Sequence, residues 1–168
     1  KTMNADVHLN LETLNQSALK RAMGCFVTGI AVVTTRHDGV DFGMTCNSFN
    51  TVSLDPPLVL WSVQRSASSY EAFTRSGGYA VSILDADQDK LVRRFTHGPQ
   101  EERFAGLPLT RLESGRVVLD GAVACFDCSL EKSVSAGDHD VLIGRVLDFA
   151  SQDDGSPLGY GRGEFKAF

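Results

Sequence analysis

Short runs of alternating apolar and polar residues, separated by turn residues, cover most of this chain. Alternation with a period of two is typical of β-strands that bury one face. Together with continuous β-rich runs such as the apolar run 58–61, it predicts strands over residues 30–36, 40–46, 49–54, 58–63, 79–84, 117–118, 122–134, 140–149 and 163–168. The Asp38-Gly39 pair between the first two runs predicts a tight hairpin, because both residues tolerate a positive φ.

Three segments have the spacing of a helix instead, namely residues 18–26, 68–75 and 87–95. Asn15 or Ser17 is expected to cap the first of them, and Asp87 the third. Many short strands with few helices predict a mostly-β domain of the barrel type rather than alternating βαβ units. We expect a polar N-terminal arm over residues 1–14 and one domain over residues 15–168.

Length and composition exclude several classes of protein. The 168 residues are enough for one domain with a substantial core. The formal net charge is −5, and residues 90–94 carry only three positive charges, which disfavours nucleic-acid binding. No apolar run approaches the roughly 20 residues of a membrane span, and no signal-peptide pattern opens the chain. Four cysteines give no disulfide framework, so we expect a cytoplasmic protein without membrane attachment.

The segment from Gly43 to Pro57 carries the most informative chemical pattern. Six of its fifteen residues are Thr, Asn or Ser, and it contains no Lys or Arg. Hydroxyls and amides at the end of one strand and the start of the next suit a neutral, hydrogen-bonding ligand that carries a phosphate. Without a basic residue in the segment, we expect hydroxyls and backbone N–H groups to hold such a ligand, rather than ion pairs.

Three further motifs have a simple structural interpretation. Cys125 and Cys128 have C-x-x-C spacing, but residues three apart on a strand point to opposite faces, and no second ligand pair accompanies them. Residues 159–163 lack the following helix of a dinucleotide-binding loop, so we expect a bend before the last strand. His139 lies between two aspartates at the mouth of a hairpin, where composition alone favours an exposed turn residue. No metal site is predicted.

The spacing T-x-N-S-F-x-x-V-S-L-x-P-P-L, which begins at Thr45, resembles the signature of the flavin reductase-like split-barrel proteins. Blocks similar to the family follow the same order and spacing over residues 25–35, 66–73, 94–106, 137–146 and 160–168. The resemblance extends from about Ala18 to the end of the chain. It implies a mostly-β, FMN-binding split barrel of Greek-key-like topology with a few short flanking helices.

Members of this family are NAD(P)H:flavin oxidoreductases that supply reduced flavin to two-component monooxygenases. The resemblance therefore implies a homodimer that transfers a hydride from NADH or NADPH to FMN or FAD. It also implies that a separate flavin-dependent monooxygenase receives the reduced flavin.

The resemblance also assigns residues to the site. The family's cofactor-binding positions correspond to Thr28, Gly29, Ile30, Thr45, Cys46, Asn47, Ser48, Ser53, Pro57, Ser62, Ser66, Ser68, Ser69 and Arg103. Asp138, His139 and Tyr160 correspond to the nicotinamide side, with His139 as the catalytic residue. Cys46 stands where many relatives have a small hydroxyl or aliphatic residue, and it adds an oxidation-sensitive thiol near the flavin.

Two other functions and two simpler residue roles fit the same sequence. A non-enzymatic, flavin-binding electron carrier would keep residues 45–53 but lack a usable nicotinamide site. An enzyme similar to pyridoxamine-phosphate oxidase would need basic residues around a second phosphate, and these are sparse near the motif. Ser66, Ser68 and Ser69 fit helix capping as well as phosphate binding, and Arg103 fits a surface charge.

Overall fold

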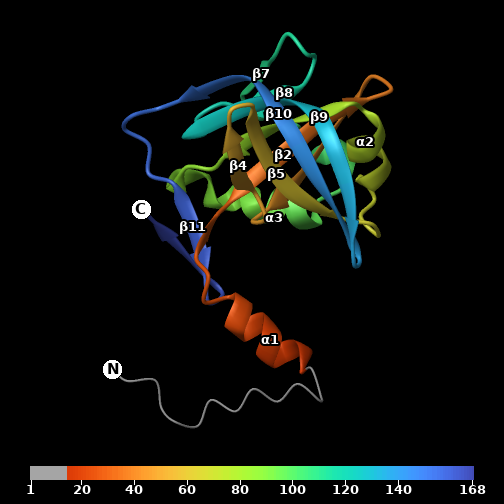
Figure 1. Cartoon of the computed structure of the whole chain (residues 1–168). Helices are drawn as coiled ribbons and strands as arrows, with labels where there is room; N and C mark the ends of the chain where they lie inside the picture. Colours follow the sequence, from red (N-terminus) through yellow and green to blue (C-terminus); the bar gives the residue numbers. More distant parts are fainter. Residues whose placement is uncertain (1–14) are drawn as a thin grey trace.

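Antiparallel strands form most of the computed structural model, which describes residues 15–168 (Figure 1). The strands are β1 (Thr28–Gly29), β2 (Ala31–His37), β3 (Val40–Cys46), β4 (Asn50–Leu54), β5 (Pro57–Gln64), β6 (Gly78–Ile83), β7 (Leu109–Arg111), β8 (Val117–Leu119), β9 (Ala124–Ala136), β10 (His139–Ser151), β11 (Leu158–Gly161) and β12 (Glu164–Ala167). The helices are α1 (Gln16–Met23), α2 (Tyr70–Arg75) and α3 (Asp89–His97), with 3₁₀ turns η1 (Ala86–Gln88) and η2 (Gln100–Glu102). The predicted polar arm over residues 1–14 lies outside the described residues.

Seven of these strands form one antiparallel sheet in the order β3-β2-β6-β9-β10-β5-β4. Its edge strands, β3 and β4, are consecutive in the chain and are joined by residues 47–49 alone. A flat sheet of this size would separate its edges by roughly 29 Å, whereas so short a connection spans at most about 14 Å. The sheet must therefore curl until its edges approach, which produces the barrel (Figure 1). We call the connection 47–49 and the two strand ends it joins the seam.

Two hydrophobic clusters pack on opposite faces of β2. The first centres on Trp61, whose ring meets Phe73 and Tyr79 edge-on at centroid distances of 4.8 and 5.9 Å. The second contains Phe95 from α3 together with residues of β8 and β11. Because both faces are covered, residues 31–35 of β2 are all buried, and this strand shows an apolar run rather than alternation.

α3 packs directly on β3 because that strand has a glycine at the point of contact. A Cβ on Gly43 would lie 2.8 Å from ring atoms of both Phe95 and Phe104. These two rings meet edge-on at a centroid distance of 5.2 Å. Thr45 lies on the same face of the strand and donates its hydroxyl to the carbonyl of Val92 at 2.8 Å. α3 is thereby fixed along the last residues of β3, next to the seam.

The predicted elements are present, with each end within three residues of its expected position. The pattern does not predict β1, β7 or β11, because strands of two to four residues are too short to show alternation. β11 also corrects the bend expected over residues 159–163. The chain stays extended to Gly161 and turns at Arg162 and Gly163, which both have positive φ angles.

Side-chain caps fix the start of two helical segments. The Asn15 side chain accepts the backbone N–H groups of Ser17 and Ala18, which confirms it as the cap of α1. Asp87 does not cap α3. Asp85 accepts the Asp87 N–H at 3.0 Å instead, because a 3₁₀ turn precedes α3 and moves the capped end upstream.

α1 extends away from the barrel, and none of its residues is buried (Figure 1). The N–H of Arg162 donates to the carbonyl of Gly24 at 2.7 Å, so the end of α1 is attached to the β11–β12 turn. Within residues 15–168, no helix has both the length and the apolar character required to cross a membrane.

Candidate functional site

A groove at the seam brings several predicted residues together. One lobe, of about 890 Å³, lies between the end of α1, Thr28 and the β11–β12 turn. A second lobe, of about 460 Å³, lies between the end of β3, α3 and β12. Asn47 and Tyr160 line both lobes, so the lobes are adjacent, and we call the two together the seam groove.

Strand pairing places the predicted residues in this groove. Thr28 lies opposite Tyr160 in the β1–β11 pair, and Gly29 lies opposite Gly159 beside them. The Tyr160 ring contacts Phe165 at a centroid distance of 5.2 Å, and both rings line the second lobe. The predicted residues whose atoms line the groove are Thr28, Ile30, Thr45, Cys46, Asn47 and Tyr160.

Thr28 lines the larger lobe, and its hydroxyl is buried without a hydrogen-bond partner among the described residues. Leaving such a group unpaired costs about 1–3 kcal/mol, so a hydrogen-bonding ligand in the larger lobe would relieve that cost. Asn47 adds an exposed amide where the lobes meet. These groups fit a flavin or a nicotinamide, because both are flat rings with carbonyl and N–H groups on their edges.

Cys46 contributes a thiol to the wall of the second lobe. Its side chain is only 8% exposed, and burial raises the pKa of the thiol to about 12. The thiol therefore stays protonated at neutral pH, whereas oxidation proceeds through the thiolate. The sequence led us to expect an oxidation-sensitive thiol near the flavin. The structure corrects this expectation, because the Cys46 thiol is an unreactive part of the groove wall.

Ser48 lies on the seam and connects it to β5. Its hydroxyl oxygen accepts the backbone N–H of Ser62 at 2.9 Å. The backbone pairing of β4 with β5 ends at Asn50 opposite Leu60. Beyond that point the Ser48 side chain, rather than a backbone carbonyl of β4, accepts the N–H of Ser62. The predicted residues Ser48 and Ser62 therefore hold the seam closed beside the groove.

The pair Asp138–His139 lies on the β9–β10 hairpin and does not line the seam groove. His139 Nδ1 is 2.7 Å from a carboxylate oxygen of Asp138, and the His139 side chain is 40% exposed. This hydrogen bond holds the pKa of the Asp138 carboxyl below its ordinary value. Ser62 pairs with Val141 of β10, which is two residues after His139. Because Ser62 is also bonded to Ser48 on the seam, these two serines connect the seam to the hairpin.

A charged cluster fixes this hairpin to the start of α2. Asp140 accepts the hydroxyl of Tyr70 at 2.6 Å and Nε of Arg65 at 2.9 Å. Arg65 also donates to Ser135, and its backbone N–H donates to the carbonyl of Asp138 at 3.0 Å. The hydrogen bonds from Tyr70 and Arg65 lower the pKa of the Asp140 carboxyl. The segment between β5 and α2, through Arg65 and Tyr70, thus sets the position of the hairpin.

The predicted phosphate-binding serines do not line either lobe of the groove. Ser66 and Ser68 are exposed in the turn between β5 and α2. Ser69 is buried at the N-cap position of α2, but its hydroxyl contacts the sulfur of Met44 at 3.7 Å instead of capping the helix. The alternative interpretation of Ser69 as a helix cap is therefore wrong.

Arg103 is buried, which corrects its interpretation as a surface charge. Its guanidinium donates to the carbonyls of Gly43 at 2.6 Å and Gly98 at 2.9 Å, and burial lowers its pKa. It ties β3 to the end of α3 without lining the seam groove. Ser53 and Pro57 lie at the β4–β5 hairpin, where they line a different, largely apolar pocket.

The groove also contains residues that the sequence does not single out. Basic residues line both lobes, namely Lys20, Arg21, Arg93 and Arg162. His97, expected on the surface, is exposed and also lines the second lobe. The positive charges within residues 90–94 and the arginine of the 159–163 motif are visible in the sequence, but neither lies near the signature at Thr45.

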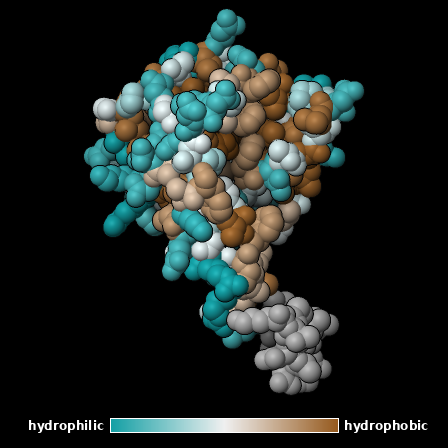
Figure 2. All heavy atoms as spheres, turned by 90° about the vertical axis from the view of Figure 1, so that its left-hand side faces the viewer, coloured by the Kyte–Doolittle hydropathy of each residue, from teal (hydrophilic) through white to brown (hydrophobic). Residues whose placement is uncertain are grey.

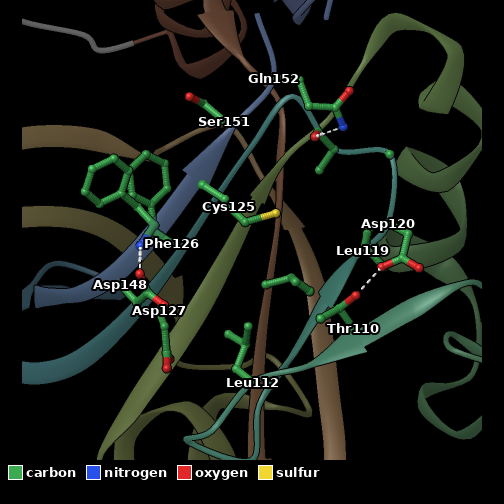
Figure 3. Close-up of a pocket in the computed structure, with 15 residues that line it drawn as sticks. Thr110, Leu112, Leu119, Asp120, Cys125, Phe126, Asp127, Asp148, Ser151 and Gln152 are labelled. Carbon is green, nitrogen blue, oxygen red and sulfur yellow. Dashed lines mark hydrogen bonds between the residues drawn. The ribbon is translucent and has the colours of Figure 1, made fainter.

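A separate cavity of about 280 Å³ contains none of the predicted site residues (Figure 3). Cys125 lines it, and its sulfur lies 3.9 Å from the hydroxyl of Ser82. Cys128 is fully buried in the cluster around Trp61. The two cysteines are free thiols on opposite faces of β9, as predicted. No group of three metal-ligating side chains occurs within residues 15–168.

Known proteins share this sequence and fold. Residues 23–168 match the flavin reductase-like domain. The chain is 41% identical to FMN reductase (NADH) SmoA of Agrobacterium fabrum, over 92% of this chain and 87% of that protein. It is 42% identical to the reductase component of the flavin-dependent trigonelline monooxygenase of Acinetobacter baylyi, over 88% of this chain and 47% of that longer protein.

A solved structure agrees with these matches. The NADH:FAD oxidoreductase SgcE6 of Streptomyces globisporus C-1027 superposes with a TM-score of 0.87 at 34% identity, over 92% of this chain and 93% of that one. The mostly-β split-barrel fold expected from the Thr45 signature is thereby confirmed. From the family match over residues 23–168 and these relatives, the chain belongs to the flavin reductase-like domain family.

Proposed function

We propose that this chain is an NAD(P)H-dependent flavin reductase that supplies reduced FMN or FAD to a separate flavin-dependent monooxygenase. The observation that carries the proposal is the seam groove, which places the unpaired hydroxyl of Thr28 and the amide of Asn47 beside the family signature. The proposal is supported by a relative in sequence named as an NADH-dependent FMN reductase, by a relative in fold named as an NADH:FAD oxidoreductase, and by a relative in sequence named as the reductase component of a trigonelline monooxygenase.

The chain's own task is to bind and orient two rings. A bound flavin accepts a hydride from a reduced nicotinamide, and the cofactors themselves supply this chemistry. Tyr160, which is half-buried, offers aromatic surface to a flat ring. The amide and backbone N–H of Asn47 lie beyond the β2–β3 ladder, which ends at Cys46. They are therefore placed to stabilise negative charge that develops on a flavin edge.

We assign the nicotinamide side to the Asp138–His139 hairpin. Asp138 engages Nδ1 of His139, which leaves Nε2 for the carboxamide of a nicotinamide. The contacts of Asp140 with Tyr70 and Arg65 hold the hairpin in place, so the ring is presented from a rigid support. Hydride transfer needs no proton from His139, so its proposed role is to position the nicotinamide.

We expect the purified chain to oxidise NADH in the presence of FMN or FAD, and to reduce the flavin in the absence of oxygen. The measurement is the loss of NADH absorbance, followed by the loss of flavin absorbance under anaerobic conditions, with NADPH tested in parallel. Flavin binding without NADH oxidation would contradict the proposal and indicate an electron carrier. Oxidation of pyridoxamine phosphate without a nicotinamide would indicate the oxidase alternative.

We also propose that the chain forms a homodimer. Large hydrophobic side chains are exposed beside the β4–β5 hairpin, where Leu54 is 95% and Phe149 70% accessible. They border an apolar pocket of about 710 Å³, and Figure 2 shows hydrophobic residues gathered along one side of the molecule. Exposed patches of this kind mark interaction surfaces, and β4 is an unpaired sheet edge at the same place.

Light scattering at micromolar concentration should therefore give twice the monomer mass of 18.2 kDa. Leu54→Asp should shift the population to monomer, because it puts a charge into the apolar surface. Val40→Asp is the matched control, since Val40 is also exposed but lies on the β2–β3 hairpin. A wild-type chain that scatters only as a monomer would refute the dimer.

The compartment we propose for this reaction is the cytoplasm. All four cysteines are free thiols, as is usual where glutathione and thioredoxin keep thiols reduced. The reaction also draws on a pool of reduced nicotinamide dinucleotide, which the cytoplasm contains.

A further inference from the structure

The arginines of this chain divide into two groups. Eight of the eleven use their guanidinium groups in ion pairs or hydrogen bonds with the protein: Arg36, Arg65, Arg75, Arg94, Arg103, Arg111, Arg116 and Arg145. The guanidinium groups of Arg21, Arg93 and Arg162 have no such partner among the described residues. All three of these residues line the seam groove.

The three arginines reach the groove from three different elements. Arg21 comes from the last turn of α1 and Arg162 from the β11–β12 turn, and both line the larger lobe. The bond from the Arg162 N–H to the Gly24 carbonyl, 2.7 Å long, holds these two elements together. Arg93 lines the second lobe from α3, which Gly43 and Thr45 hold against β3.

The groove is therefore basic in a chain whose net charge is −5. Its lining residues include Lys20 and the three arginines, against a single carboxylate, that of Asp89. Within residues 15–168, the carboxylates that form ion pairs with arginines, those of Asp41, Glu71, Asp127, Glu131 and Asp140, pair with arginines outside the groove. Unpaired guanidinium groups that line two adjacent lobes are suited to phosphate, because their planar N–H donors match its oxygens.

We propose that Arg21, Arg93 and Arg162 form a phosphate-binding rim of the seam groove, which holds the phosphate or pyrophosphate of a bound nucleotide. The inference rests on the proposed reductase function, because it places the rings of that nucleotide beside Thr28 and Asn47. It moves the phosphate site away from Ser66 and Ser68, which the sequence indicated. Those serines lie in the turn before α2 and do not line the groove.

The test compares flavins that differ only in phosphate. Dissociation constants for riboflavin, FMN and FAD are measured by flavin fluorescence for wild type, Arg93→Gln, Arg162→Gln and Arg21→Gln. Each substitution that removes a phosphate contact should raise the dissociation constant for FMN or FAD by about tenfold. Riboflavin affinity should not change. Added salt should weaken FMN and FAD binding to wild type, because the contacts are charged and exposed.

A second arm separates the phosphates of the flavin from those of the nicotinamide. KM for NADH is measured with riboflavin as the acceptor, which has no phosphate of its own. If a variant has a higher KM for NADH but unchanged FMN affinity, the arginine that was replaced binds the phosphates of the dinucleotide donor. A loss of FMN affinity with unchanged KM would assign it to the flavin, and both results support the rim.

Arg75→Gln is the matched control, because Arg75 is an exposed arginine paired with Glu71 on α2. It should leave every flavin dissociation constant at the wild-type value. The proposal is overturned if the three groove variants retain wild-type affinity for FMN, FAD and NADH. It is also overturned if they lower the affinity for riboflavin as much as the affinity for FMN. A loss of FMN affinity in Ser66→Ala/Ser68→Ala with wild-type affinity in the arginine variants would also overturn it.

Calorimetric titration with pyrophosphate keeps this test independent of the reductase activity. Wild type should bind pyrophosphate, and the triple arginine variant should not. If the chain fails to oxidise NADH but binds pyrophosphate through these arginines, the reductase proposal falls and the rim stands. If it oxidises NADH normally and the triple variant binds pyrophosphate as wild type does, the rim falls and the reductase proposal stands.

Discussion

Replacing His139 by alanine should lower kcat/KM for NADH by ten- to a hundredfold, equivalent to about 1.4–2.7 kcal/mol of transition-state stabilisation. The expected loss arises because the ring would no longer hold the nicotinamide against the flavin. Reduction should slow without stopping, since the hydride moves directly between the two rings. Flavin affinity should stay near the wild-type value, because the seam groove and not the hairpin contains the proposed flavin contacts. Anaerobic stopped-flow reduction measures both quantities.

His37→Ala is the matched control for this substitution. His37 also lies at a β-hairpin beside an aspartate, with Nε2 3.6 Å from a carboxylate oxygen of Asp38. It belongs to the β2–β3 hairpin, so its removal should leave NADH kinetics unchanged. Wild-type reduction rates and NADH affinity in His139→Ala would make His139 a turn residue and remove the nicotinamide assignment from the β9–β10 hairpin.

Arg116→Met should destabilise the fold by about 3–5 kcal/mol, the largest stability effect we expect from one charged residue of this chain. Arg116 donates to Asp127 at 2.9 Å, and the two side chains are only 12% and 9% exposed. Removing the guanidinium leaves a nearly buried carboxylate on β9 without a counter-charge. Urea unfolding should show a lower midpoint with an unchanged slope.

Two further variants separate the uncompensated charge from lost packing. Arg145→Met removes an arginine of the same sheet whose partner, Glu131, is exposed, and it should cost about 1 kcal/mol or less. Asp127→Asn in the Arg116→Met background removes the uncompensated charge and should recover part of the lost stability. A loss in Arg116→Met no larger than in Arg145→Met would show that the buried pair contributes little.

Local patterns were enough to predict the longer elements of this fold. The positions of β2 to β6 and of the two long strands β9 and β10 follow from alternating or continuously apolar runs, and Asn15 follows from capping chemistry. The opposite orientation of Cys125 and Cys128 follows from the period of a strand. Each of these features depends on residues that are neighbours in the chain, so the sequence contains them directly.

The family signature also supplies one part of the seam groove. Thr45, Cys46 and Asn47 line the seam groove, and Tyr160 lines it from the last block of the resemblance. The assignment of single residues from that resemblance did not extend to side-chain environments. Arg103, for example, has its guanidinium on the backbone of Gly43 and Gly98, which the run of charged residues around it did not reveal.

The amino-acid sequence by itself determined the longer strands, the hairpins and the family of this protein, because neighbouring residues set the apolar pattern, the turns and the signature spacing. Only the tertiary structure decided that residues 47–49 close the barrel and that Thr28 and Tyr160 meet at its seam. Only the tertiary structure, too, separated the paired arginines from Arg21, Arg93 and Arg162. Whether an arginine is neutralised depends on which carboxylates and carbonyls the fold brings within about 3 Å of it, and those groups come from distant parts of the chain.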